Sequence, residues 1–103
     1  MSVPLSESVT AVVAANDQMA LGAIHALSAR GLAVPTDVSV TGFDDILDSA
    51  HFTPPLTTIR PDFTELGQRC IALLLEGLAG GTELADHLIM PELVVRESTA
   101  RIA

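Results

Sequence analysis

Blocks of apolar residues alternate with polar breaks along the chain, and the spacing inside each block predicts its secondary structure. Residues 9–15 (VTAVVAA) form a nearly continuous apolar run, which is typical of a strand buried on both faces of a parallel sheet. Helical spacing follows at Ala20, Ala23, Ile24 and Leu27. Asn16 can cap this helix, Asp17 suits its positive end, and Gly31 can terminate it.

A second β-branched run, residues 38–41 (VSVT), follows a short connector that contains Pro35. Strand, helix and strand joined by short links form a βαβ unit, which is normally parallel and right-handed. Residues 45–50 can form one or two helical turns, and residues 56–59 (LTTI) are typical of a third strand. The pattern therefore favours an α/β protein.

The longest predicted helix spans residues 62–79. Asp62 and Glu65 resemble a capping box at its start, and Gly80-Gly81 can end it. Its apolar stripe comprises Phe63, Leu66, Gly67, Cys70, Ile71, Leu74 and Leu78. Residues 88–90 and 93–95 are short strand candidates. We expect one α/β domain over residues 9–103, with residues 1–8 as a lead-in.

Composition and charge narrow the range of functions expected for the chain. The 103 residues are 49% hydrophobic, with three Phe and no Trp or Tyr, so the core is expected to be aliphatic. The net charge is −8, and the five basic residues are dispersed arginines. Phosphate backbones are bound by clustered Lys and Arg, so these residues are not expected to bind DNA directly.

The remaining composition argues against metal, cofactor, catalytic or membrane roles. Cys70 lies in a helix stripe and is interpreted as a packing residue. His25, His51 and His87 lack metal-ligand spacing, and no G-x-S-x-G or phosphate-binding glycine loop occurs. With neither a signal peptide nor a run of the ~20 apolar residues that span a bilayer, the cytoplasm is the expected location.

Polar residues follow the first two predicted strands at the point where each strand ends. Asn16-Asp17 closes the first, and Asp44-Asp45 closes the second. Ligands of open α/β sheets bind outside the carboxyl ends of the strands, so one carboxamide and up to three carboxylates should converge at this edge. Acceptors without nearby cations suit a neutral, hydroxyl-rich ligand such as a sugar rather than a phosphate.

Other interpretations of these residues stay open. Asn16 and Asp17 could serve only as helix caps, and Asp44 and Asp45 only as turn formers. A second function class is a phosphoacceptor or enzyme that holds Mg²⁺ on Asp44, Asp45 and Asp48. Such sites use a lysine, and the chain has none.

Four motifs in order resemble the lac/galactose repressor family: AANDQMALGAIHAL, VPTDVSVTGFDD, TPPLTTIRPDFTELGQ and MPELVVREST. The resemblance runs from about Val9 to Thr99. It implies part of a doubly wound parallel sheet in three α/β/α layers, the second lobe of a periplasmic binding protein-like effector domain. It also implies a transcriptional regulator rather than an enzyme, whose DNA contacts come only from an N-terminal helix-turn-helix outside this chain.

The resemblance also implies ligand contacts. In the family, the residues corresponding to Asn16 and Asp44 contact the sugar, and the one corresponding to Phe63 walls the pocket. From pattern alone, an aromatic residue at a helix start such as Phe63 favours a core anchor over a ligand wall. The implied effector is a small neutral sugar, with a galactoside as the suggested class, and no cofactor or metal. The family's other sugar contacts lie upstream of this chain.

The resemblance further implies a homodimer or larger assembly. The expected interface comprises Gln18, Leu21, Gly22 and His25 on the first helix, followed by Asp48, Ser49 and Phe52. A close-packed interface would explain a glycine inside the helix, where it costs about 1 kcal/mol relative to alanine. The leucine stripe of residues 62–79 is expected to be covered by a second copy. A sugar-transport binding protein of the same fold is a further alternative, disfavoured by the absence of a secretory signal.

Overall fold

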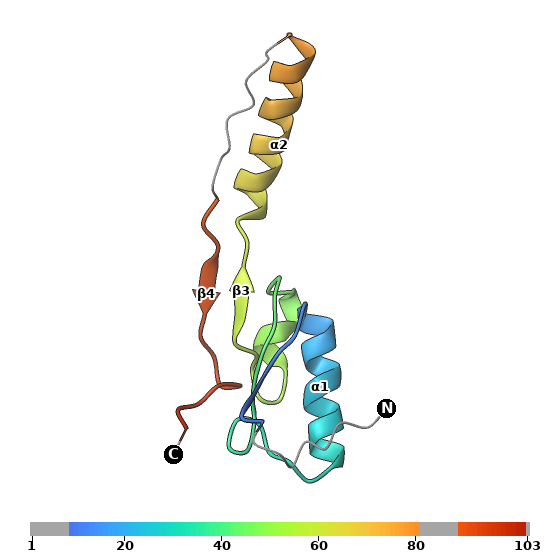
Figure 1. The fold of residues 1–103 in the computed structure, drawn as a ribbon, viewed down its shortest axis with the longest axis vertical. Helices are drawn as coiled ribbons and strands as arrows, with labels where there is room; N and C mark the ends of the chain where they lie inside the picture. Colours follow the sequence, from blue (N-terminus) through green and yellow to red (C-terminus); the bar gives the residue numbers. More distant parts are fainter. Residues whose placement is uncertain (1–8, 81–88, 103) are drawn as a thin grey trace. The chain divides into compact units, whose positions relative to one another are not determined.

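The computed structural model describes residues 9–80 and 89–102, and the chain divides into two compact units. The first unit contains residues 1–60 and 93–103, and the second contains residues 61–92. Figure 1 shows the elements of each unit, coloured along the sequence.

A parallel βαβ motif forms the first unit, as predicted. Strand β1 (Ala11–Val13) pairs in parallel with β2 (Ser39–Thr41), with Val12 opposite Val40, and helix α1 (Asp17–Ala29) connects them (Figure 1). Both strands are shorter than the predicted runs. Val13 is 83% exposed, so the prediction that the first strand is buried on both faces is wrong for this residue.

The predicted ends of α1 are confirmed. Asn16 is the N-cap, and its Oδ1 accepts a 2.8 Å hydrogen bond from the Met19 backbone amide. At the other end, the Leu32 amide donates to the Leu27 carbonyl at 2.9 Å, and Gly31 has φ +77°. Together these form a Schellman motif, which requires the left-handed conformation that glycine adopts without a steric penalty.

An aliphatic core joins one face of α1 to β2 and the segment that precedes β3. Its buried apolar side chains are Ala20, Ile24, Leu27, Val38, Val40 and Leu56. Ala20, Ile24 and Leu27 are four and three residues apart, so they lie on one helical face. Fully burying an aliphatic side chain contributes about 1.5–3 kcal/mol, so these contacts fix α1 against the sheet.

A second two-stranded sheet follows, connected to the first by a bridge. A 3₁₀ helix, η1 (Leu47–His51), precedes β3 (Thr58–Arg60), and Thr57 forms a parallel bridge with Thr41. Strand β4 (Glu92–Val94) pairs with β3. These elements confirm the predictions for residues 45–50, 56–59 and 93–95 to within about two residues. Of the strand predicted over 88–90, residue 88 lies outside the described residues, and residues 89 and 90 are not in a strand.

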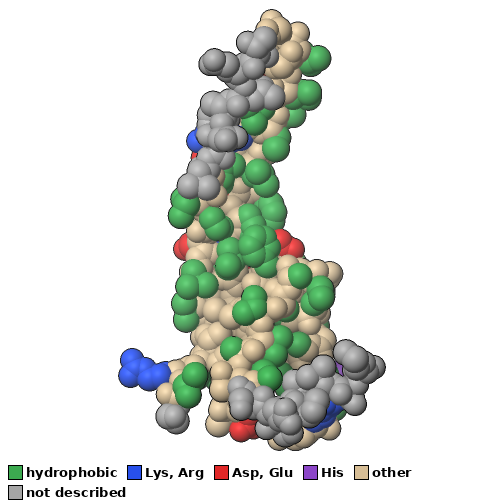
Figure 2. Space-filling view, in the orientation of Figure 1, with side chains coloured by type: hydrophobic (Ala, Val, Ile, Leu, Met, Phe, Trp, Pro, Cys, Tyr) green, Lys and Arg blue, Asp and Glu red, His purple; other side chains and the backbone are tan. Residues whose placement is uncertain are grey.

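The second unit is dominated by helix α2 (Phe63–Leu78). Its capping residue is confirmed, because Asp62 Oδ1 accepts from the Glu65 amide at 2.9 Å, and Gly80 follows its end with φ +86°. No residue of α2 is buried, and Figure 2 shows apolar side chains along this unit. Its exposed apolar residues are Phe63, Leu66, Ile71, Leu74, Leu75 and Leu78. Across residues 9–80 and 89–102, no helix is long and apolar enough to cross a membrane.

Candidate functional site

The ends of β1 and β2 lie side by side, as the strand pattern predicts. The Ala14 amide donates to the Thr41 carbonyl at 2.9 Å, and the Asp17 amide donates to the Phe43 carbonyl at 3.0 Å. These two bonds continue the strand pairing into the loops. The loop that begins with Asn16 and the loop that carries Asp44 are therefore neighbours at the carboxyl edge of the parallel pair.

Asn16 and Asp44 each keep a polar group available at this edge. Both residues are half-buried. Asn16 uses its Oδ1 to cap α1, and within the described residues its amide nitrogen has no hydrogen-bond partner. The Asp44 backbone is fixed by a 2.9 Å bond from its amide to the Ile59 carbonyl, whereas its carboxylate has no partner in the same part of the chain. A donor and an anionic acceptor are thus present on adjacent loops.

Asp17 does not join them, which corrects the prediction that as many as three carboxylates converge at this edge. Its side chain is fully buried. Oδ1 accepts from the Thr58 hydroxyl at 2.6 Å, and Oδ2 accepts from the Ser49 hydroxyl at 2.5 Å and from the Ile46 amide at 2.9 Å. A buried carboxylate is stable only when its oxygens are satisfied in this way, so Asp17 ties α1 to η1 and β3 from the inside.

Gly42 makes room for this buried carboxylate, a role that was not predicted from the sequence. A Cβ at this position would lie 2.2 Å from Asp17 Oδ1 and 2.9 Å from a methyl carbon of Leu56. Any side chain there would collide with the core and with the Asp17 hydrogen bonds. The available signal was a glycine between a strand and a polar turn, which is typical of a close backbone approach.

Asp45 is paired with two arginines, which corrects the prediction of a site without cations. Its Oδ2 lies 2.7 Å from Arg60 Nε, and its Oδ1 lies 2.8 Å from Arg96 Nη1. Burial raises the pKa of the Asp45 carboxyl, but the hydrogen bonds and charges of Arg96 and Arg60 outweigh burial and hold the pKa below its usual value. Asp45 therefore stays ionised at neutral pH and forms an ion pair with each guanidinium group.

This pairing also bears on the Mg²⁺ alternative. A carboxylate that already accepts from two guanidinium groups has little capacity left for a hydrated cation. Within residues 9–80 and 89–102 there is no group of three or more His, Cys, Asp or Glu side chains that could hold a metal ion. Asp44 remains as the carboxylate of this turn that can accept hydrogen bonds from a ligand.

Phe63 is the first residue of α2 and lies in the second unit, with its side chain 58% exposed. It is therefore not a core anchor within its own unit. The structure places Asn16 and Asp44 together in the first unit, and the role of Phe63 rests on the family resemblance alone.

The residues of the predicted dimer interface fall into two groups. Gln18, Leu21, Gly22 and His25 are all exposed and share one face of α1, and Asp48 is exposed in η1. Ser49 is fully buried with its hydroxyl bound to Asp17, and Phe52 is half-buried against the core. The exposed group offers a surface, whereas Ser49 and Phe52 serve mainly the interior of the first unit.

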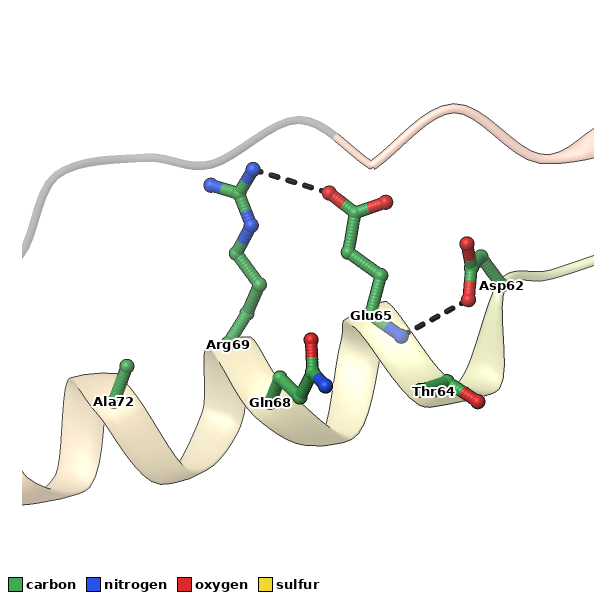
Figure 3. A pocket seen from close by; sticks show the side chains of 6 residues that line it. All are labelled: Asp62, Thr64, Glu65, Gln68, Arg69 and Ala72. Carbon is green, nitrogen blue, oxygen red and sulfur yellow. Dashed lines mark hydrogen bonds and ion pairs between the residues drawn. The ribbon is translucent and has the colours of Figure 1, made fainter.

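Three surface hollows are lined by residues other than Asn16 and Asp44. The one shown in Figure 3 runs along the first turns of α2 and is lined by Asp62, Thr64, Glu65, Gln68, Arg69 and Ala72. Arg69 and Glu65 form a 3.1 Å ion pair across it. The other two belong to the first unit, one beside Pro35 and the C-terminal segment and one between Ile24 and Pro54. None of the three was anticipated from the sequence.

Comparisons with known proteins show which family this chain resembles. The chain is 54% identical over 93 residues to the HTH-type transcriptional regulator MalR of Streptomyces coelicolor, covering 88% of this chain and 27% of MalR. It is 47% identical over 90 residues to the lactose operon repressor of Escherichia coli, covering 87% of this chain and 25% of that repressor. The chain thus spans about a quarter of the length of these relatives.

Solved structures of transcriptional regulators also match this chain. A lac repressor dimer bound to operator and the anti-inducer ONPF superposes with a TM-score of 0.81 at 46% identity, covering 89% of this chain and 32% of that one. A complex of the transcriptional regulator CelR with cellobiose has a TM-score of 0.77 at 38% identity, covering 87% and 28%. The α/β class predicted from the sequence is thereby confirmed as part of a periplasmic binding protein-like fold.

The sequence profile of the periplasmic binding protein-like domain matches residues 3–99, nearly the whole chain. The relatives that resemble it are named as transcriptional regulators or repressors. The chain therefore belongs to the periplasmic binding protein-like domain family, in the group that contains the lac repressor and related transcriptional regulators.

Proposed function

We propose that this chain is the ligand-sensing and dimer-forming part of a lac-repressor-like transcriptional regulator, and that its ligand is a small neutral sugar. Another part of the regulator contacts DNA. Ligand binding changes DNA affinity because the ligand site and the DNA site are linked to the same conformational equilibrium. The chain itself performs no catalysis.

The observation that carries the proposal is the pairing of Asn16 and Asp44. The Asp17–Phe43 backbone bond makes their loops neighbours, and both side chains retain groups that can bind hydroxyls. Sugar hydroxyls donate to a carboxylate and accept from a carboxamide, so the two side chains complement a polyol. Asp45 is paired with the two arginines, so the unpaired charge at this turn is the Asp44 carboxylate, which repels a phosphate group and favours a neutral ligand over a sugar phosphate.

The proposal is tested by titrating the chain with methyl β-D-galactoside, cellobiose and galactose 6-phosphate. Calorimetry and amide NMR shifts are the readouts. We expect a neutral sugar to shift the amides of Asn16 and Asp44, and Asp44→Asn to weaken binding by about 10–100-fold, since a hydrogen bond to a charged group contributes about 1.5–3 kcal/mol. Asparagine tolerates positive φ, so the turn should survive the substitution.

Asn16→Ser separates the role of Asn16 as a helix cap from its role in binding the ligand. Serine still caps α1 but removes the carboxamide nitrogen, so stability should be retained while sugar affinity falls. If neither neutral sugar produces heat or shifts these two amides, or if Mg²⁺ and acetyl phosphate do so instead, the proposal fails.

The dimer surface is proposed to be the exposed face of α1 formed by Gln18, Leu21, Gly22 and His25, together with Asp48 in η1. Two related solved structures are of dimeric lac repressors. Leu21 is 45% exposed in the chain alone, and a Cβ on Gly22 would meet nothing within 4 Å. Glycine at the centre of this face allows two helices to approach closely.

Gly22→Ala should therefore act in opposite directions on folding and association. In the monomer, alanine stabilises α1 by up to about 1 kcal/mol because the space is empty. In a close-packed dimer, the added methyl group should weaken association by about tenfold, measured by sedimentation equilibrium. Gly77→Ala, also in open space but in α2, is the control and should leave association unchanged. Equal dimer affinity for Gly22→Ala and the unaltered chain would exclude this face.

A further inference from the structure

The turn that carries Asp44 has an unusual backbone. Asp44 and Asp45 both have positive φ angles, +112° and +56°. Such conformations cost about 1–3 kcal/mol each for residues other than glycine, and they persist only where surrounding contacts hold them. The contacts that hold this turn therefore decide where the Asp44 carboxylate lies.

Three sets of contacts hold it. The Asp44 amide donates to the Ile59 carbonyl, and the Ile46 amide donates to the buried Asp17 carboxylate. The Asp45 carboxylate, which lies between these two residues in the chain, forms ion pairs with Arg60 and Arg96. The two backbone bonds fix the residues on either side of Asp45, and the ion pairs fix Asp45 itself.

Arg96 is a rigid partner in this arrangement. Its guanidinium also donates to the Leu56 carbonyl at 3.0 Å, its backbone amide donates to the Thr57 hydroxyl at 2.9 Å, and its side chain is only 16% exposed. Two residues later, the buried Ser98 hydroxyl accepts from the Thr57 amide and donates to the Val40 carbonyl. The segment that carries Arg96 is thus hydrogen-bonded to β2 and to the residue that precedes β3.

We propose that Asp45, held by Arg96 and Arg60, is a positioning residue that keeps Asp44 in its ligand-binding conformation. This inference rests on the proposed function for its ligand but not for its geometry. Asp45 does not contact the ligand. It contributes by raising the fraction of molecules in which Asp44 is correctly placed, and apparent affinity scales with that fraction.

Asp45→Asn tests this in the full 103-residue chain. Asparagine keeps the side-chain shape and tolerates positive φ, but it removes the negative charge that forms ion pairs with the arginines. The matched control is Glu97→Gln, which removes one negative charge from the neighbour of Arg96. Glu97 is exposed, and within the described residues its side chain has no partner. Thermal unfolding of both variants establishes that they are folded.

The decisive readout is the NMR coupling between Cα and Hα of Asp44, which reports positive φ without any ligand. We expect the Asp44 coupling to move toward a conformational average in Asp45→Asn and to stay unchanged in Glu97→Gln. Affinity for methyl β-D-galactoside should fall about tenfold in Asp45→Asn alone. If Asp45→Asn lowers stability but leaves the Asp44 coupling intact, Asp45 is merely structural and the inference is overturned.

The two proposals fail in distinguishable ways. If the unaltered chain binds no neutral sugar, the proposed function fails, whereas the coupling at Asp44 still reports on positioning. If sugar binds and Asp45→Asn binds it as tightly as the unaltered chain, the positioning role fails and the function stands.

Discussion

Gly42→Ala should destabilise the first unit by about 3 kcal/mol, at the upper end of what overpacking costs. The new Cβ would lie 2.2 Å from Asp17 Oδ1 and 2.9 Å from the Leu56 methyl carbon, and both neighbours are buried. Neither can move aside cheaply, because Asp17 is held by three hydrogen bonds and Leu56 is enclosed by the core. Since small domains are stable by only about 5–15 kcal/mol, this loss is large.

Urea unfolding followed by circular dichroism measures the effect. Gly77→Ala is the matched control, since a Cβ there meets nothing within 4 Å, and alanine should be neutral or slightly stabilising in a helix. An unchanged unfolding midpoint for Gly42→Ala would mean that the Asp17 carboxylate does not occupy the place described.

Asp17→Ala should cost about 3–5 kcal/mol. The substitution leaves two buried hydroxyls, of Ser49 and Thr58, and the half-buried Ile46 amide without an acceptor, and each unsatisfied buried donor costs about 1–3 kcal/mol. Because Ile46 directly follows the Asp44-Asp45 turn, the amide signals of both aspartates should also shift. Urea unfolding and amide NMR spectra measure the two effects.

Asp17→Asn separates hydrogen bonding from shape. The amide fills the same space, and its oxygen can still accept from the Ile46 amide and the Ser49 hydroxyl. Its nitrogen then faces the Thr58 hydroxyl, which can rotate and accept. We therefore expect Asn to cost distinctly less than Ala, about 1–2 kcal/mol. Equal losses for the two variants would show that charge, and not the hydrogen-bond pattern, determines the stabilising effect of Asp17.

Local signals in the sequence accounted for the regular elements. The i, i+4, i+7 spacing of Ala20, Ile24 and Leu27 predicted the buried face of α1, and Asn16 and Gly31 predicted its ends. Two β-branched runs joined by a helix predicted the parallel pair of β1 and β2. These features depend on interactions between residues a few positions apart, which a sequence displays directly.

The site was only partly predictable. Strand order placed Asn16 and Asp44 at one edge, but four acidic or amide residues in two pairs looked equivalent in the sequence. The structure gives them different roles, because Asp17 faces partners 29 to 41 residues away and Asp45 faces arginines 15 and 51 residues away. No local pattern specifies such distant partners.

The amino-acid sequence by itself determined the α/β class, the aliphatic core, the caps of both helices and the family, because each follows from short-range spacing or motif order. Only the tertiary structure decided that Asp17 lies inside, that Gly42 is required beside it, and that Asp45 is neutralised by Arg60 and Arg96. The physical reason is that burial and charge pairing depend on which distant side chains folding brings within hydrogen-bond distance.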